Sequence, residues 1–227
     1  MRAPIAVALD APDLATAVAW AGACRDSVST LKVGLETYLR DGAQGVAAIR
    51  AAAPECQLFL DLKLHDIPNT VAGAARSIAS LQPDFLTVHA SGGAAMIQAA
   101  AEALPSAKIT AVTVLTSMSE ADVQAVGWSG SAQESVLRLA RLAVEAGARA
   151  LVCSPAEVAA VRAEVGPAVT LVTPGVRPVG TAVGDQVRVT TPTKALADGA
   201  DLLVIGRPIT AAADPATAAA EIAASLV

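Results

Sequence analysis

Eight short apolar runs, spread along the whole chain, constrain the fold more than any other feature of this sequence. Each run is rich in Val, Ile and Leu and shows no alternation of apolar with polar residues. Uninterrupted apolar runs of this kind are typical of strands that are buried on both faces, as in a parallel sheet. We expect strands at Ile5–Leu9, Thr30–Val33, Leu58–Leu62, Phe85–Val88, Ile109–Leu115, Ala150–Cys153, Val169–Val172 and Leu202–Ile205.

Segments with helical periodicity separate these runs. Apolar residues recur three and four positions apart after the first, third and fifth runs, which places them on one face of a helix. Ser131 with Glu134, and Ser154 with Glu157, have the spacing of a capping box, the second with Pro155 at the first helical position. Further helix starts and stops are expected at Thr191-Pro192, Asp214-Pro215, Gly147 and Gly199.

Eight strand–helix units in 227 residues match a compact (β/α)8 barrel. We therefore expect an α/β fold in which residues 1–227 form a single TIM-barrel catalytic domain. A doubly wound open sheet is the alternative. Its dinucleotide-binding form is disfavoured, because no G-x-G-x-x-G follows the first run, which ends at Ala8-Leu9-Asp10-Ala11-Pro12.

Composition and charge exclude several classes of function. The net charge is −5 and no basic run is present, so we expect no nucleic-acid partner. We also expect no membrane partner, because no stretch of about 20 uncharged apolar residues exists to span a bilayer. The first residues lack the pattern of a secretory signal. Three widely spaced cysteines suggest neither a disulfide framework nor a zinc site, and a cytoplasmic location is expected.

A first group of polar residues interrupts the second and third runs. In a TIM barrel the chemistry takes place at the carboxyl ends of the strands. Asp61 and Lys63 alternate with leucines, so a period of two puts both on one face, and Lys32 can face the same interior. Buried charges are costly unless they are paired. We expect a charge array of Lys32, Asp61, Lys63 and Asp66 that keeps an ammonium group ready to donate a proton; a purely structural ion-pair network is the alternative.

A second group of residues is suited to bind an anion. Arg177 follows the seventh run and Gly206-Arg207 follows the eighth, where barrels of this type commonly bind phosphate. Arginine offers bidentate charge, and Gly206 allows close approach of the backbone. The segment Pro178–Thr190 is long enough to be typical of a lid, and Gln186 is its best phosphate donor. The alternative is that both arginines lie on the surface.

The segment Asp61-Leu62-Lys63-Leu64-His65-Asp66-Ile67-Pro68-Asn69-Thr70 resembles the D-x-K-x-x-D-I-P-x-T signature of the orotidine 5′-monophosphate decarboxylase family. The first half, D-x-K-x-x-D, is shared with sugar-phosphate relatives such as 3-keto-gulonate-6-phosphate decarboxylase and hexulose-phosphate synthase. The continuation Ile67-Pro68-Asn69-Thr70 makes the resemblance specific. The order and spacing of the family are also kept at Asp10, Lys32, Thr116-Ser117, Pro174-Gly175-Val176-Arg177 and Gly206-Arg207.

The resemblance implies decarboxylation of orotidine 5′-monophosphate to uridine 5′-monophosphate, the last step of de novo pyrimidine biosynthesis, without a cofactor or metal. Lys63 would protonate C6 of the pyrimidine, Asp61 would lie against the substrate carboxylate, and Lys32 and Asp66 would complete the charge array. The resemblance also implies a homodimer in which Asp66, Ile67 and Thr70 reach the neighbouring subunit's site. The remaining implied contacts are Asp10 and Lys32 to ribose hydroxyls, Thr116 to the pyrimidine edge, and Arg177, Gln186, Gly206 and Arg207 to phosphate.

Two other functions stay open at this point: a metal-dependent sugar-phosphate lyase and a non-enzymatic binder of phosphoribosyl ligands. His65 and His89 are a weak metal signal, because no third ligand is evident. Cys153 is expected to be a packed core cysteine rather than a nucleophile. Of the four lysines, Lys108 and Lys194 have no place in the predicted site and are expected in solvent.

Overall fold

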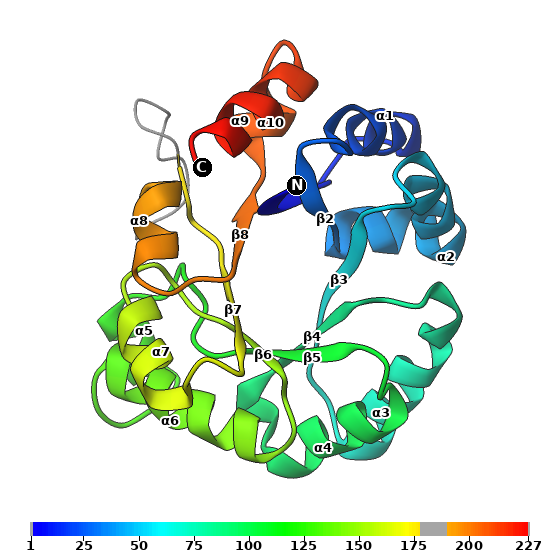
Figure 1. Ribbon diagram of the computed structural model, residues 1–227. Coiled ribbons are helices and arrows are strands. Elements are labelled where there is room, and N and C mark those ends of the chain that lie inside the picture. The colour runs from blue at the N-terminus through cyan, green and yellow to red at the C-terminus, as the bar shows by residue number, and fades with distance from the viewer. Residues whose placement is uncertain (1, 178–189, 227) are drawn as a thin grey trace.

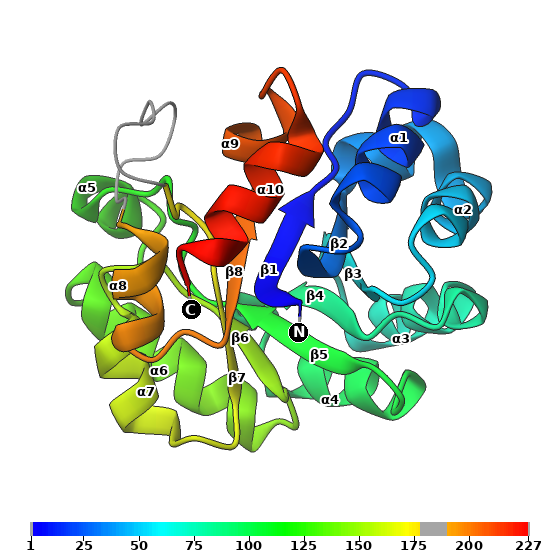
Figure 2. The same cartoon turned by 45° about the horizontal axis from the view of Figure 1, so that its top comes forward.

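The computed structural model describes residues 2–177 and 190–226. Eight parallel strands pair in sequence order and close into a barrel, and helices surround them (Figure 1). Figure 2 shows the closure, where β1 and β8 pair in parallel and α10 packs beside them. The fold is therefore the predicted α/β TIM barrel, and the open doubly wound sheet is ruled out.

The strands begin and end close to the predicted runs. The last run was expected at Leu202–Ile205, and β8 has these bounds. The expectation for Ile109–Leu115 is wrong at its end, because the pairing of the fifth strand with both neighbours stops at Val112, opposite His89 of β4 and Val152 of β6. The strands are β1 (Ala3–Ala8), β2 (Val28–Gly34), β3 (Gln57–Leu64), β4 (Phe85–His89), β5 (Lys108–Val112), β6 (Ala150–Val152), β7 (Thr170–Thr173) and β8 (Leu202–Ile205).

The helices follow the strands along the chain and lie on the outside of the barrel (Figure 1). No helix in the described parts of the chain is both long and apolar enough to cross a membrane. The α-helices are α1 (Leu14–Cys24), α2 (Leu35–Ala52), α3 (Pro68–Ser77), α4 (Ala94–Ala103), α5 (Glu120–Ala125), α6 (Ala132–Glu145), α7 (Val158–Val165), α8 (Pro192–Ala197), α9 (Arg207–Thr210) and α10 (Pro215–Ala224), with short 3-10 helices at Ala79–Leu81 (η1) and Ala90–Gly92 (η2).

Most of the predicted helix boundaries are confirmed. Ser131 and Glu134 form a reciprocal capping box at the start of α6. Gly147 and Gly199 follow helices with φ of 97° and 108°, a backbone region that favours glycine. The expectation for Ser154 is wrong: its amide and hydroxyl do bond the Glu157 carboxylate, but the intervening residues form turns and α7 begins only at Val158.

Two apolar layers explain why the strands read as continuous apolar runs. The larger layer lies between the outer face of the strands and the helices. The smaller layer lies in the barrel interior and buries the inner face of six of the eight strands, while β2 and β5 contribute the buried threonines Thr30 and Thr110. The interior layer consists of Ala6, Phe59, Phe85, Ala150, Val172 and Leu202.

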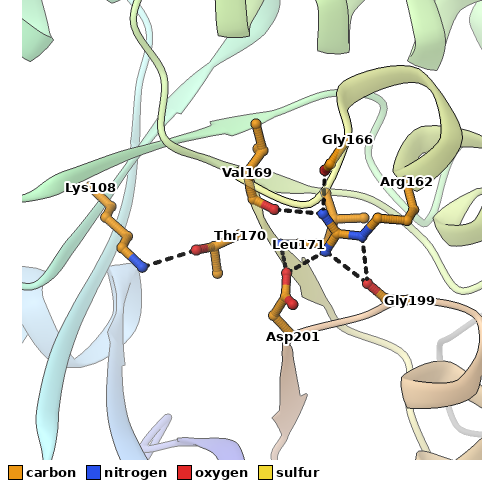
Figure 3. A network of polar contacts seen from close by, with 8 residues as sticks. All are labelled: Lys108, Arg162, Gly166, Val169, Thr170, Leu171, Gly199 and Asp201. Carbon is orange, nitrogen blue, oxygen red and sulfur yellow. Dashed lines mark hydrogen bonds and ion pairs between the residues drawn. The ribbon is translucent and has the colours of Figure 1, made fainter.

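Polar contacts close the end of the barrel at which the strands begin (Figure 3). Lys108 donates from Nζ to Thr170 Oγ1 at 2.9 Å and lies 5.3 Å from the centre of the Phe85 ring. The expectation that Lys108 is solvated is therefore wrong, because this lysine is partly buried and partnered. Lys194, in contrast, is exposed and pairs with Asp198 at 2.8 Å one helical turn away.

Candidate active site

A cavity of about 430 Å³ opens at the carboxyl ends of the strands, where the chemistry of TIM barrels takes place. Its floor is apolar and is formed mainly by Phe59, Val112, Val152, Val172 and Val204. Its polar lining contains eight of the predicted site residues: Asp10, Lys32, Asp61, Lys63, Thr116, Arg177, Gly206 and Arg207.

Four of these residues form a row of alternating charge that runs from the loop after β1 across β2 and β3. Lys32 Nζ lies 3.5 Å from Asp10 Oδ1 and 3.3 Å from Asp61 Oδ2. Lys63 Nζ lies 2.8 Å from the other oxygen of the same aspartate, Asp61 Oδ1. We call Asp10, Lys32, Asp61 and Lys63 the charged row. It brings together Lys32, Asp61 and Lys63 as predicted. Asp10, which was expected as a ribose contact, lies at the Lys32 end of the row.

The charged row keeps Asp61 ionised. Burial is the largest single influence on this carboxyl group and would raise its pKa. The charges of Lys32 and Lys63, together with hydrogen bonds from Lys63 and Thr87, outweigh burial and hold the pKa of Asp61 below its ordinary value. A negative charge therefore stays next to both ammonium groups at neutral pH.

The backbone of β3 departs from regular strand geometry at Lys63. Leu60 pairs with Leu86 and Leu64 pairs with Val88, so β3 has three residues between these pairs where β4 has one. Lys63 has a φ of 49°, in the left-handed region that costs a residue with a side chain roughly 1–3 kcal/mol and is often found at functional sites. The predicted period of two is therefore interrupted, although Asp61 and Lys63 still meet.

Three predicted site residues lie outside the cavity of their own chain. Asp66, Ile67 and Thr70 are exposed at the end of β3 and the start of α3, and Ile67 is 65% exposed. Asp66 Oδ1 accepts a hydrogen bond from the Ile67 amide at 2.6 Å and makes no ion pair with the lysines of the row within the described chain. The expected place of Asp66 in the charge array is not met within one chain.

The opposite wall of the cavity, from β7 and β8, is cationic. Arg177 follows β7, and its amide donates to Thr190 O at 2.9 Å, so that the ends of the connecting segment meet. Arg207 is the first residue of α9 and directly follows Gly206. A Cβ added at Gly206 would lie only 3.4 Å from the Ala8 side chain. Gln186 lies outside the described residues.

Two residues that support the site were not predicted. Gly34 follows Lys32 and Val33, and an added Cβ there would lie 2.6 Å from Asp10 Oδ1 and 3.0 Å from Lys32 Nζ. Only glycine leaves room for that ion pair. Thr87 hydrogen-bonds to two members of the charged row. Its signal in the sequence is a hydroxyl within the apolar run Phe85–Val88.

The remaining reactive side chains near the cavity have other surroundings. The rings of His65 and His89 lie 5.2 Å apart, and burial, with the nearby His65 and Lys63, lowers the pKa of His89. Burial raises the pKa of Cys153 to about 12, so it is a thiol at neutral pH, as expected of a packed core cysteine. In residues 2–177 and 190–226, no three His, Cys, Asp or Glu side chains converge as a metal site would need.

The cavity can bind a molecule that has an anionic group at one end and reacts at the other. Arg177 and Arg207 offer bidentate charge for a phosphate or carboxylate. Lys63 is held by a carboxylate beside an apolar floor, where it can stabilise a developing negative charge and then give up a proton.

Comparison with known proteins supports the resemblance along nearly the whole chain. Residues 3–222 match the model of the family described as "Orotidine 5'-phosphate decarboxylase / HUMPS family". The chain is 69% identical over 226 residues to the orotidine 5'-phosphate decarboxylase of Thermobifida fusca, and the alignment covers 100% of this chain and 97% of that protein. It is 57% identical to the protein of that name from Frankia casuarinae, covering 99% of this chain and 88% of the relative. The crystal structure of orotidine 5'-phosphate decarboxylase from Lactobacillus acidophilus superposes with a TM-score of 0.84 at 35% identity and covers 99% of each chain.

Proposed function

Because the chain belongs to the orotidine 5′-phosphate decarboxylase / HUMPS family, we propose that it converts orotidine 5′-monophosphate to uridine 5′-monophosphate through a C6 carbanion that Lys63 protonates. The decarboxylase activity, a step of pyrimidine biosynthesis, rests on relatives that share most of their sequence with this chain over nearly its full length. The observation that carries the mechanism is a single cavity that joins the charged row to a cationic wall.

The different charges of the two cavity walls support one direction of nucleotide binding in this proposal. Its phosphate is held by Arg177, Gly206 and Arg207, with Gln186 as a further donor. Its ribose hydroxyls bind Asp10 and Lys32, and its pyrimidine edge meets Thr116. This leaves C6 and its carboxylate beside Asp61 and Lys63, at the far end of the charged row.

The chemistry at C6 follows from the charges at that end. Asp61 places a negative charge against the substrate carboxylate, which favours its departure as CO₂. The C6–carboxylate bond breaks and leaves its electron pair on C6, in an orbital that the ring cannot delocalise. The Lys63 ammonium stabilises this carbanion and transfers a proton from Nζ to C6, which yields the product. Lys63 then regains a proton from water.

Phosphate binding contributes to the rate although it takes place far from C6. Binding energy from a part of the substrate that does not react can offset the cost of placing the carboxylate against Asp61. The cationic wall therefore has a role in catalysis as well as in affinity.

We propose that residues 1–227 form one catalytic domain that acts as a cytoplasmic homodimer. Support comes from Asp66, Ile67 and Thr70, which belong to the family signature but are exposed and do not line the cavity of their own chain. An isoleucine that is 65% exposed next to an aspartate is well suited to contact a second copy. In the dimer, Asp66 completes the charge array of the neighbouring subunit, and Ile67 and Thr70 contact that subunit's substrate.

An assay with and without a chelator tests the function directly. Purified protein is treated with excess chelator and mixed with orotidine 5′-monophosphate, and the ultraviolet absorbance of the substrate is followed. We expect the same rate of absorbance loss with chelator and with added Mg²⁺. A rate that requires Mg²⁺ would favour a metal-dependent sugar-phosphate lyase, and binding without turnover would favour a ligand-binding protein.

A further inference from the structure

Thr87 of β4 lies beside the charged row but does not line the cavity. Its side chain is fully buried. Its hydroxyl accepts a hydrogen bond from the Lys63 amide at 2.8 Å and donates one to Asp61 Oδ1 at 3.1 Å. We propose that Thr87 is a positioning residue for the decarboxylation, holding the Lys63 ammonium and the Asp61 carboxylate in their reactive places. This role rests on the proposed function.

The first argument is the irregular pairing of β3 with β4. Between the paired positions Leu60–Leu86 and Leu64–Val88, the two extra residues of β3 interrupt the regular ladder. The Lys63 amide lies in this interruption and finds its acceptor in the Thr87 side chain instead of a β4 carbonyl. The hydroxyl therefore anchors the one residue of β3 that has a left-handed backbone, with φ of 49°.

The second argument is that the contacts form a closed ring. The Lys63 amide donates to the Thr87 hydroxyl, which donates to Asp61 Oδ1. The same Asp61 oxygen accepts from Lys63 Nζ at 2.8 Å. One hydroxyl thus fixes both the backbone and, through Asp61, the ammonium end of the same lysine. Asp61 keeps its other oxygen for Lys32.

The chain offers a matched control at Thr110. It is the β5 residue paired with Thr87, is fully buried as well, and its hydroxyl donates to Lys108 O at 3.0 Å within its own strand. Replacing either threonine by valine removes one buried hydroxyl at nearly constant volume. Thr87→Val therefore removes a hydrogen-bond partner of the charged row, whereas Thr110→Val does not.

The test compares steady-state kinetics of the full-length wild type, Thr87→Val, Thr87→Ser and Thr110→Val on orotidine 5′-monophosphate. In Thr87→Val we expect kcat to fall about 10- to 100-fold, as misplacement of a reacting group does, with KM changed less than about threefold. Thr87→Ser should recover most of the loss, and Thr110→Val should keep kcat near that of the wild type. If Thr87→Val does not fold, Thr87→Cys, which is a weak donor of similar size, takes its place with the same expected fall.

A pH profile separates positioning from a general weakening of the fold. Lys32 from β2, Lys63 from β3 and His89 from β4 interact electrostatically with Asp61, and none of them changes in these variants. Loss of the Thr87 hydrogen bond raises the pKa of Asp61, so the acid limb of kcat should move to higher pH in Thr87→Val and stay in place in Thr110→Val.

Three outcomes would overturn the inference. They are equal kcat values for the two valine variants, a Thr87→Ser variant as slow as Thr87→Val, or an acid limb that does not move. Failure of the wild type to decarboxylate the substrate would refute the proposed function and the positioning role together. An active wild type with an unimpaired Thr87→Val would refute the positioning role alone.

Discussion

Lys63, the proposed proton donor, lies where the backbone of β3 departs from regular strand geometry. Its Nζ is held 2.8 Å from Asp61 and its amide is bonded to a threonine side chain. Arginine cannot replace it as a proton donor, because the guanidinium stays protonated at neutral pH. The chain uses arginine for most of its positive charge, and two of its four lysines, Lys32 and Lys63, lie in the charged row.

Arg207 allows a separate test of the cationic wall. Arg207→Ala should lower kcat/KM for orotidine 5′-monophosphate about 10- to 100-fold, because a hydrogen bond to a charged group contributes roughly 1.5–3 kcal/mol. Titration calorimetry should show weaker binding of uridine 5′-monophosphate and unchanged binding of uridine, which lacks the phosphate. Equal weakening of both ligands would remove Arg207 from the phosphate site.

At the scale of strands and helices, prediction succeeded where the signal is local. The strands were found because burial on both faces leaves a continuous apolar run, and most cavity residues were found because they follow those runs. The irregular part of β3 and the role of Thr87 depend on how β3 pairs with β4. The end of β5 depends on where its pairing with β4 and β6 stops. The pairing of strands that are far apart in the chain cannot be predicted from the local pattern of apolar and polar residues.

Asp66 shows a different limit of the sequence. The signature places it three residues after Lys63, and the expectation of one array followed from that spacing. The structure shows Asp66 exposed and bonded to its own neighbour's amide. A spacing along one chain does not tell which subunit's cavity a side chain enters.

For the whole molecule, the two ends of the barrel have different tasks. The charged row and the left-handed backbone of Lys63 lie at the carboxyl ends of the strands, around the cavity. At the other end, Arg162 bonds the carbonyls of Gly166, Val169 and Gly199 and the Asp201 carboxylate, which ties α7 to the starts of β7 and β8 (Figure 3). This division between a reactive end and a stabilising end is typical of TIM barrels.

The proposed dimer can be tested by mixing two inactive chains. In a mixed dimer of Lys63→Ala and Asp66→Asn, one cavity has both defects and the other has none, if Asp66 reaches across the interface. Random exchange should therefore restore about a quarter of wild-type activity, since half of the dimers are mixed and each has one intact site. Dimers are confirmed by sedimentation before the assay. Mixed dimers without restored activity would show that Asp66 acts within its own chain or not at all.

Release of CO₂ by Lys63→Ala is the most direct test of the proposed mechanism. The variant and a matched control, Lys194→Ala, are mixed with orotidine 5′-monophosphate labelled in the carboxylate. Lys194 lies exposed on α8 and pairs with Asp198, so its loss should leave turnover near that of the wild type. We expect Lys63→Ala to fold with an unchanged circular dichroism spectrum and to release no measurable CO₂. Near-normal release from a folded Lys63→Ala would contradict the account.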